Sequence, residues 1–309
     1  MFAAAITTVL FACSGVCGQR IAMRLGSMFG NFLRLLISSL VLGLIVVLFF
    51  RDSIAPATFG WYFVSGLIGF GLGDVALFLA YERIGSRLSV LLTLCLAPVF
   101  AITLEWIWLG NTITWQVMLA TAAILMGVIL ALRPGVKNGQ SNERRGSFPV
   151  GVIAGIVAGF GQGCGAVISR HAENVETEIG VSVNGLSAAF QRVIAGFLVA
   201  GIVVLILKWT RGRFRKRDNP EPESRQMGPF WLWLLGSALF GPVIGVSCFQ
   251  WALESLESGI VLAIVAMTPI VMMPLSAITE KDRPSVLAII GAVIAVCGGA
   301  AIYLVADTG

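Results

Sequence analysis

The sequence predicts an all-α, polytopic membrane protein of about ten transmembrane helices in two inverted five-helix repeats. Three observations lead to this fold class: the chain is very apolar, long apolar runs alternate with short polar breaks, and the second half repeats features of the first. Of its 309 residues, 57% are hydrophobic and 12% are charged, and the mean hydropathy is +0.92. Soluble domains are near half apolar and a quarter charged. Lipid is therefore the expected solvent for most of the chain.

The predicted spans are the apolar runs bounded by charged residues, Pro, Asn and Gly. A span needs roughly 20 apolar residues to cross about 30 Å of hydrocarbon, so the chain holds about ten spans and no soluble domain. In order they are residues 2–22, 31–50, 58–81, 87–109, 113–132, 148–170, 184–208, 229–252, 258–279 and 285–305. The first run has no basic residues before it and more spans after it, so we expect a retained helix and not a cleaved signal peptide.

Two hydrophilic stretches interrupt the series of spans. The first, residues 133–147, is the expected linker between a first five-helix repeat at 1–132 and a second at 148–309. The second stretch, 208–228, contains a cluster of basic residues. They are Arg211, Arg213, Arg215, Lys216 and Arg217. Such a cluster is expected to anchor the topology beside anionic lipid headgroups.

Matched residues recur at nearly constant offsets when the second half is laid on the first. Phe32, Arg34 and Gly43 are followed 158 positions later by Phe190, Arg192 and Gly201; Trp61, Gly66, Gly71 and Tyr81 are followed 170 positions later by Trp231, Gly236, Gly241 and Trp251; and Pro98 and Gly127 are followed 171 positions later by Pro269 and Gly298. A slowly drifting offset over several segments indicates duplication. Because each copy has an odd number of spans, the second copy must enter the membrane from the opposite side. This is the inverted-repeat plan of secondary transporters.

Positive charge is unequally distributed between the two sides of the predicted membrane. The breaks after odd-numbered spans hold nearly all of the Lys and Arg outside the spans, whereas those after even-numbered spans hold only Arg51 and Arg170. The positive-inside rule then places the odd breaks, including 208–228, in the cytoplasm and both termini outside. An acidic break after the sixth span, with Glu173, Glu176 and Glu178, is expected to face outward.

With these features the chain resembles the drug/metabolite transporter superfamily, and specifically its ten-helix EamA-type members. The resemblance covers essentially the whole chain and rests on an Arg early in the second helix of each repeat, an aromatic residue closing the third, a Pro within the fourth and Gly residues in the fifth. These residues are Arg34, Tyr81, Pro98, Gly127, Arg192, Trp251, Pro269, Gly291 and Gly298. The resemblance implies a multi-pass transporter with cytoplasmic termini. Since the charge distribution favours outside termini, both orientations stay open.

Charged side chains inside spans are candidates for a substrate or proton pathway, because each costs roughly 2.5–3.5 kcal/mol at mid-helix. Asp74 lies deep in the third span in a glycine-rich run, where it could bind a cationic substrate group or exchange a proton. The alternative is a structural carboxylate paired with Arg34 or with a backbone group. Arg34 and Arg192 could anchor a substrate anion or the gating helices, or extend to the headgroups. Glu105 is a further candidate, although the Trp residues after it indicate a place near the membrane surface.

Neutral polar and aromatic residues complete the candidate pathway. Gln162, Ser247 and Gln250 lie inside spans, and Trp251 closes the eighth span. Hydrogen bonding between helices is the alternative role for the polar residues, at roughly 0.6 kcal/mol each.

Proline and glycine residues predict where helices bend and where they pack closely. Pro98 and Pro269 occupy equivalent places in the two halves and would kink their helices, so they mark the expected wall of the cavity. Glycines recur every four residues from Gly151 to Gly163 on the sixth span. This spacing predicts a smooth ridge for close helix packing.

Several kinds of site are not expected in this chain. All six cysteines lie in apolar runs and the single histidine, His171, lies in a polar break, which disfavours both disulfides and a metal site. The glycine-rich runs do not follow a strand in a βαβ unit, so no nucleotide cofactor is expected. The Lys and Arg residues do not line one exposed face, so nucleic acid is not an expected partner.

The leading prediction is a secondary transporter in the cell (inner) membrane. It would move a small polar metabolite, amino-acid-like or related, or a drug by alternating access, with the proton as the candidate coupling ion. A lipophilic-cation or multidrug exporter is the alternative. An integral membrane enzyme is disfavoured, because the chain lacks a nucleophile elbow and a paired-carboxylate motif and has only one histidine. A non-transporting scaffold is disfavoured by the repeat and by Asp74 inside a span. The sequence leaves open the substrate, the direction of transport and the oligomeric state.

Overall fold

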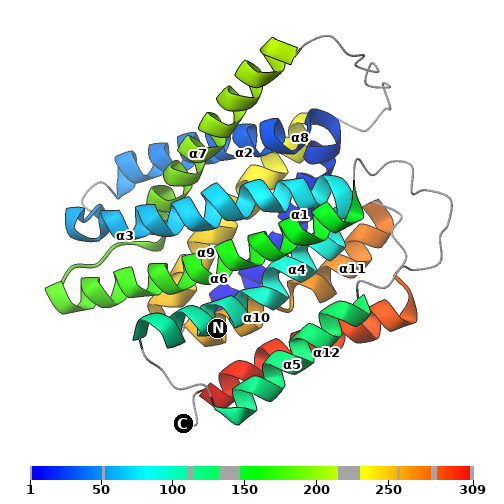
Figure 1. Cartoon of the computed structure of the whole chain (residues 1–309). Coiled ribbons are helices and arrows are strands. Elements are labelled where there is room, and N and C mark those ends of the chain that lie inside the picture. Colours follow the sequence, from blue (N-terminus) through cyan, green and yellow to red (C-terminus); the bar gives the residue numbers. More distant parts are fainter. Residues whose placement is uncertain are drawn as a thin grey trace.

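The computed structural model describes residues 2–50, 53–109, 114–131, 147–214, 230–255, 258–279 and 284–306, and the regular structure among them is helical. The helices run roughly side by side as one bundle (Figure 1). Within these residues, six helical stretches are long and apolar enough to cross a membrane. They are Phe2–Leu25, Ser27–Phe49, Pro56–Trp108, Phe148–Ile179, Gly185–Thr210 and Phe230–Glu254. The expected all-helical, multi-pass membrane architecture is confirmed at this level.

Two glycines interrupt or kink helices in the first half of the chain. Its elements are α1 (Phe2–Leu25), α2 (Ser27–Phe49), α3 (Pro56–Gly66), the π-helical segment η2 (Leu67–Asp74), α4 (Val75–Leu109) and α5 (Trp115–Ala131). Gly26 separates α1 from α2, and Gly85 kinks α4; both have φ of 82°, a conformation that glycine adopts without steric cost. The kink at Gly85 falls between the expected third and fourth spans.

The second half repeats this order of elements. It contains α6 (Phe148–Ile179), α7 (Gly185–Phe214), α8 (Phe230–Ala238), the π-helical segment η3 (Leu239–Val243), α9 (Ile244–Ser255), α10 (Ser258–Val265), α11 (Thr268–Thr279) and α12 (Val286–Ala306). A turn at residues 266–267 divides the expected ninth span, immediately before Pro269. Proline cannot donate a backbone hydrogen bond to the preceding turn, so the helix starts again there.

The sixth span is longer than the apolar pattern suggested. Helix α6 continues to Ile179, and Glu173 and Glu176 are buried on it. The expected end of the sixth helix near residue 170 was therefore wrong, while the side of the membrane that these residues face stays a prediction. Glu173 is held by Arg170 at 3.2 Å, and Glu176 accepts a hydrogen bond from the backbone of Val183. These local partners allow carboxylates to remain within the packed part of the helix.

The glycine ridge on α6 is confirmed, and it packs against α4. A Cβ at Gly155 would lie 2.6 Å from a methyl carbon of Leu92, and one at Gly163 would collide with the carbonyl oxygen of Ala97. The missing side chains therefore let the two helix backbones approach closely.

Contacts between the two halves are reciprocal. A Cβ at Gly43 on α2 would lie 3.1 Å from the ring of Phe190 on α7, and one at Gly201 on α7 would lie 3.5 Å from the ring of Phe32 on α2. Because the early residue of each helix meets the late glycine of the other, α2 and α7 are antiparallel. In the sequence, Phe32 and Phe190 are 158 positions apart, and so are Gly43 and Gly201. The two halves are thus related by a local two-fold operation at this contact.

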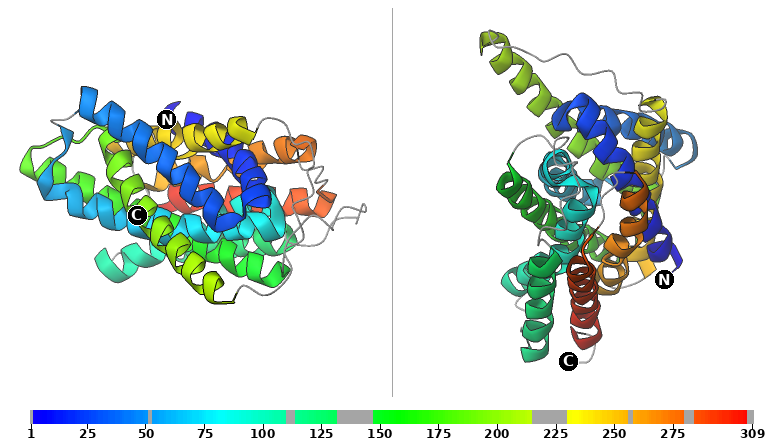
Figure 2. Two further views of the ribbon diagram at one scale, coloured as in Figure 1. Left: turned by 90° about the horizontal axis from the view of Figure 1, so that it is seen from above. Right: turned by 90° about the vertical axis from the view of Figure 1, so that its right-hand side faces the viewer.

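The same reciprocity occurs between α5 and α12, which lie together along one edge of the bundle (Figures 1 and 2). A Cβ at Gly127 would meet the backbone of Gly291 and Ala295, and a Cβ at Gly298 would meet Ala120 and Ile124. The contact residues form three pairs that are 171 positions apart in the sequence: Gly127 with Gly298, Ala120 with Gly291, and Ile124 with Ala295. The symmetric contact therefore extends over two separate helix pairs.

Some expectations concern residues outside the described ranges. Most of the expected linker at 133–147 and the basic residues Arg215, Lys216 and Arg217 belong to this group. The domain boundaries at 1–132 and 148–309 stay predictions.

Candidate functional site

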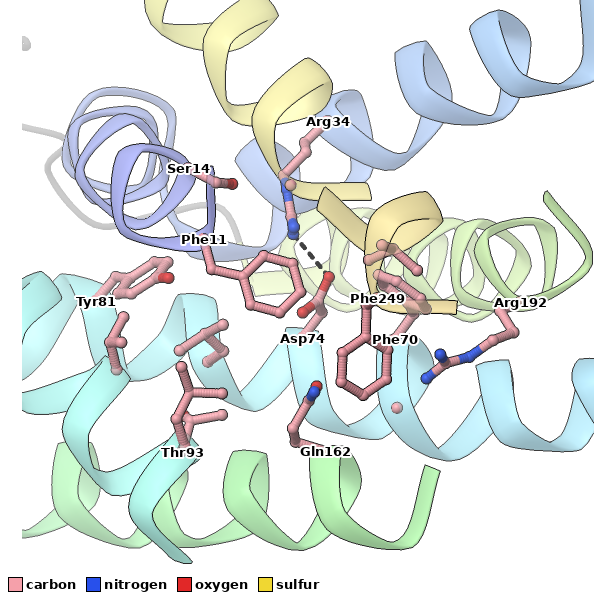
Figure 3. Close-up of a pocket in the computed structure, with 16 residues that line it drawn as sticks. Phe11, Ser14, Arg34, Phe70, Asp74, Tyr81, Thr93, Gln162, Arg192 and Phe249 are labelled. Atoms are coloured by element: carbon pink, nitrogen blue, oxygen red, sulfur yellow. Dashed lines mark hydrogen bonds and ion pairs between the residues drawn. The ribbon is translucent and has the colours of Figure 1, made fainter. Parts of the chain in front are cut away.

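A cavity lies near the centre of the bundle, between elements of both halves (Figure 3). Its volume is about 70 Å³. Since a water molecule needs about 10–15 Å³ of cavity volume, this space holds a few molecules of that size. The lining residues are Phe11, Ser14, Arg34, Gly69, Phe70, Asp74, Leu77, Tyr81, Val90, Thr93, Leu94, Gln162, Arg192, Gly241, Val246 and Phe249. We call this space the central chamber.

Asp74 forms a buried ion pair with Arg34 across the central chamber. The distance from Arg34 Nη1 to Asp74 Oδ2 is 2.6 Å, and the two side chains are 7% and 12% exposed. Figure 3 shows the pair between α2 and the end of η2. Charge-assisted hydrogen bonds of this length are among the stronger ones in proteins. In this conformation Asp74 is thus paired with Arg34, as the structural alternative for this residue predicted.

Glycine in η3 makes room for the Arg34 side chain. A Cβ at Gly241 would lie 2.8 Å from Arg34 Nη2 and 2.5 Å from Ser14 Oγ. Arg34 also donates through Nε to the backbone oxygen of Ser237, at 3.4 Å. Helix α8, through Ser237, and the π-helical segment η3, through Gly241, therefore help to hold the guanidinium of Arg34 beside Asp74.

Arg192, the repeat counterpart of Arg34, has neutral partners. Its Nη1 donates to Gln250 Oε1 at 2.5 Å, and Gln250 Nε2 donates to Ser169 Oγ at 2.7 Å. The Nε of Arg192 has no hydrogen-bond partner among the described residues. Its guanidinium carbon lies 5.6 Å from the centre of the Phe70 ring. Gln250, although it does not line the chamber, orients a side chain that does.

Aromatic side chains form the apolar part of the chamber. Phe11 and Phe249 have ring centroids 6.4 Å apart, and Figure 3 shows Phe249 and Phe70 between Asp74 and Arg192. Tyr81, at the other side, is buried beside Phe78. The chamber therefore offers charged groups at separate places with aromatic surface between them.

The other predicted site residues lie outside the chamber lining. The hydroxyl of Ser247 donates to the backbone oxygen of Val243, and Trp251 is 55% exposed. Glu105 is half-buried towards the end of α4, while Pro98 and Pro269 are buried within their helices. Of the predicted pathway residues, the structure brings Asp74, Gln162, Arg34 and Arg192 to the chamber, with Gln250 one contact away.

Sequence reasoning did not select several residues that line the chamber. Phe11, Ser14, Thr93 and Phe249 are ordinary residues of apolar helices, and no signal in one sequence distinguishes their faces. Gly241 is different, because the repeat pairs it with Gly71. Among the described residues, no group of three or more His, Cys, Asp or Glu could hold a metal ion.

Comparison with known proteins follows the same division into halves. A model of the EamA-like transporter family matches residues 1–133 and 149–304. Curated proteins contain no significant match to the chain. Among 28 matching chains of solved structures is one described as "Crystal structure of protein", which is 16% identical with a TM-score of 0.59, over 98% of this chain and 98% of that chain. At this identity the likeness shows a shared fold over nearly the whole length.

Proposed function

The chain belongs to the EamA-like transporter family, and from this we propose that it is a secondary transporter for a small polar metabolite or drug. The observation that supports this proposal is the central chamber, where buried charged groups from both halves meet in a bundle of apolar helices. Charged groups in such surroundings are costly and typically lie on substrate or ion pathways. The interface of repeats near the middle of the membrane is the usual place for such a site.

The proposed architecture is ten spans in two inverted repeats of five. The third span is α3, η2 and the first part of α4, which ends at the Gly85 kink, and the fourth is the rest of α4. In the second half, α8, η3 and α9 form the eighth span, and α10 with α11 forms the ninth. The antiparallel, reciprocal pairs α2 with α7 and α5 with α12 support a two-fold axis perpendicular to the helices. Such an axis lies in the membrane plane.

The proposed mechanism is alternating access around the chamber. A metabolite needs more room than the few waters that fit there now, so helices must move apart on one side to admit it. Of the described residues that line the chamber, Asp74 is the only acidic one, and it links η2 to α2 through Arg34. Protonation of Asp74 would release Arg34, which makes this pair the candidate site for coupling to protons.

Transport by the purified protein tests the proposed function. In proteoliposomes, we expect uptake of at least one radiolabelled compound from a panel of amino acids, organic acids and organic cations. Counterflow against preloaded unlabelled compound would measure exchange without an imposed gradient, and a pH gradient would reveal coupling to protons. Protein-free liposomes are the control. Absence of flux for the whole panel would count against a transporter of this kind.

The orientation in the cell membrane is tested with a cysteine in place of Ser224, in the basic loop 208–228. If the positive charges keep this loop in the cytoplasm, a membrane-impermeant maleimide should not label Ser224→Cys in intact cells, but should label it in inside-out vesicles. The unsubstituted protein gives the background from its six cysteines. Labelling from outside intact cells would reverse the proposed orientation.

A further inference from the structure

The charges that line the central chamber do not balance. Arg34 and Asp74 neutralise one another at 2.6 Å, which leaves the guanidinium of Arg192. Among the described residues, no carboxylate lies within ion-pair distance of Arg192, and its hydrogen-bond partner is the neutral amide of Gln250. With Asp74 ionised, the described residues that line the chamber therefore carry one net positive charge.

Acidic residues near Arg192 are already engaged. The charges of Glu173 and Asp74 act on Arg192 from a distance. Glu173, however, is held by Arg170 at 3.2 Å, and Asp74 by Arg34. Arg192 is only 2% exposed, and an arginine stays protonated in proteins. A buried charge without a counter-ion is unfavourable, so an anion that reaches this guanidinium would be stabilised.

We propose that the substrate is an organic monocarboxylate with an apolar body, and that Arg192 binds its carboxylate. This substrate class rests on the proposed transport function. A guanidinium presents parallel donors that match a carboxylate, and the Nε of Arg192 has no partner among the described residues. A ligand with a single negative charge neutralises the positive charge of the chamber, whereas a dianion such as a phosphate monoester would leave a net negative charge.

The aromatic side chains beside Arg192 account for the apolar body. The ring of Phe70 lies next to the guanidinium of Arg192, and the ring of Phe249 packs near that of Phe11. Figure 3 shows Phe70 and Phe249 between Asp74 and Arg192. A carboxylate bound at Arg192 would thus have aromatic surface next to the adjoining part of the molecule, and the charged groups beyond that surface, Arg34 and Asp74, are paired with one another. Organic cations have a poorer site, because the carboxylate of Asp74 is already paired.

Binding of four probes that share a phenyl ring tests the proposed class. They are 3-phenylpropionate, phenethylamine, 3-phenylpropanol and phenyl phosphate, and their dissociation constants are measured by calorimetry with the purified protein in detergent. We expect 3-phenylpropionate to bind most tightly. In Arg192→Gln its affinity should fall about tenfold or more, because a charge-assisted, bidentate contact is lost. Lys208→Gln removes an exposed positive charge from the same helix and should leave the affinity unchanged.

The variants also report whether the effect is one of folding. Arg192→Gln removes a charge that lacks a counter-ion, so its melting temperature should not fall, and Arg192→Lys should recover only part of the affinity. The carboxylate proposal is overturned if the amine, the alcohol or the phosphate binds at least as tightly as 3-phenylpropionate, if 3-phenylpropionate does not bind, or if Arg192→Gln binds it normally. If the binding measurements contradict the carboxylate proposal but amines are transported in proteoliposomes, the proposed transport function is retained and only the proposed substrate class is rejected.

Discussion

Replacing Asp74 with Asn is expected to lower the free energy of unfolding by about 3–5 kcal/mol. The substitution leaves the Arg34 guanidinium buried without the carboxylate that it contacts at 2.6 Å, and removal of one partner of a buried ion pair typically costs this much. Thermal or denaturant unfolding of the purified variant in detergent measures the loss. Glu178→Gln is the matched control, because it neutralises an exposed carboxylate on α6 and should unfold like the unsubstituted protein.

A double variant separates the charge from the shape of the site. In Arg34→Gln with Asp74→Asn, neither charge remains and two amides face one another, so much of the lost stability should return. Unfolding of Asp74→Asn at the same temperature as the unsubstituted protein would show that the pair contributes little.

The same Asp74 variant addresses coupling to protons. Asparagine keeps the size of the side chain but cannot exchange a proton, so proton-driven flux should be lost in Asp74→Asn proteoliposomes. Measurements are made at a temperature at which the variant remains folded. If the variant transports at an unchanged rate with unchanged dependence on pH, Asp74 has a structural role only, and Gln162 and Gln250 become the residues to test.

Gly66→Ala is expected to have the other large effect. A Cβ at this position would collide with the carbonyl oxygen of Arg192 and lie 2.6 Å from its Cα, so α3 and α7 must move apart. Overpacking of this kind costs typically about 1–3 kcal/mol and more against backbone. Because the displaced residue is Arg192 itself, ligand binding in the chamber should be lost together with stability.

Gly60→Ala is a matched control on the same helix. A Cβ at Gly60 has no atom within 4 Å, so the substitution should be neutral or slightly stabilising, since alanine favours helix over glycine by about 1 kcal/mol. Melting temperatures of the two variants provide the comparison. Equal melting temperatures would contradict the close approach of α3 and α7.

The charged residues of the chamber could be predicted because a charge stands out in an apolar helix. Asp74, Arg34 and Arg192 were selected on that basis, and all three line the chamber. The pairing of Asp74 with Arg34 could be considered but not decided from the sequence, and the contact of Arg192 with Gln250 was not anticipated. Both contacts depend on which faces of four different helices meet, and a uniformly apolar helix has no polar stripe to indicate its inner face.

The ends of helices were harder to predict than their presence. Helix α6 continues beyond its apolar run because Glu173 and Glu176 find local partners, which hydropathy does not record. The division between α10 and α11 depends on where the chain turns before Pro269 and not on any change in polarity. The repeat, by contrast, was readable from spacing alone, since duplicated glycines form the reciprocal contacts between halves.

The π-helical segments η2 and η3 determine which way the following residues point. Successive residues of an α-helix are about 100° apart around the axis, and a π turn takes in more residues than an α turn. The side chains after each π-helical segment are therefore rotated about the helix axis relative to their places on a continuous α-helix. Asp74 ends η2, and Phe249 follows η3. A helical wheel drawn through either segment with uniform α-helical spacing would place these side chains on the wrong side of the helix. The face that points into the chamber thus depends on the π-helical backbone as well as on the order of residues.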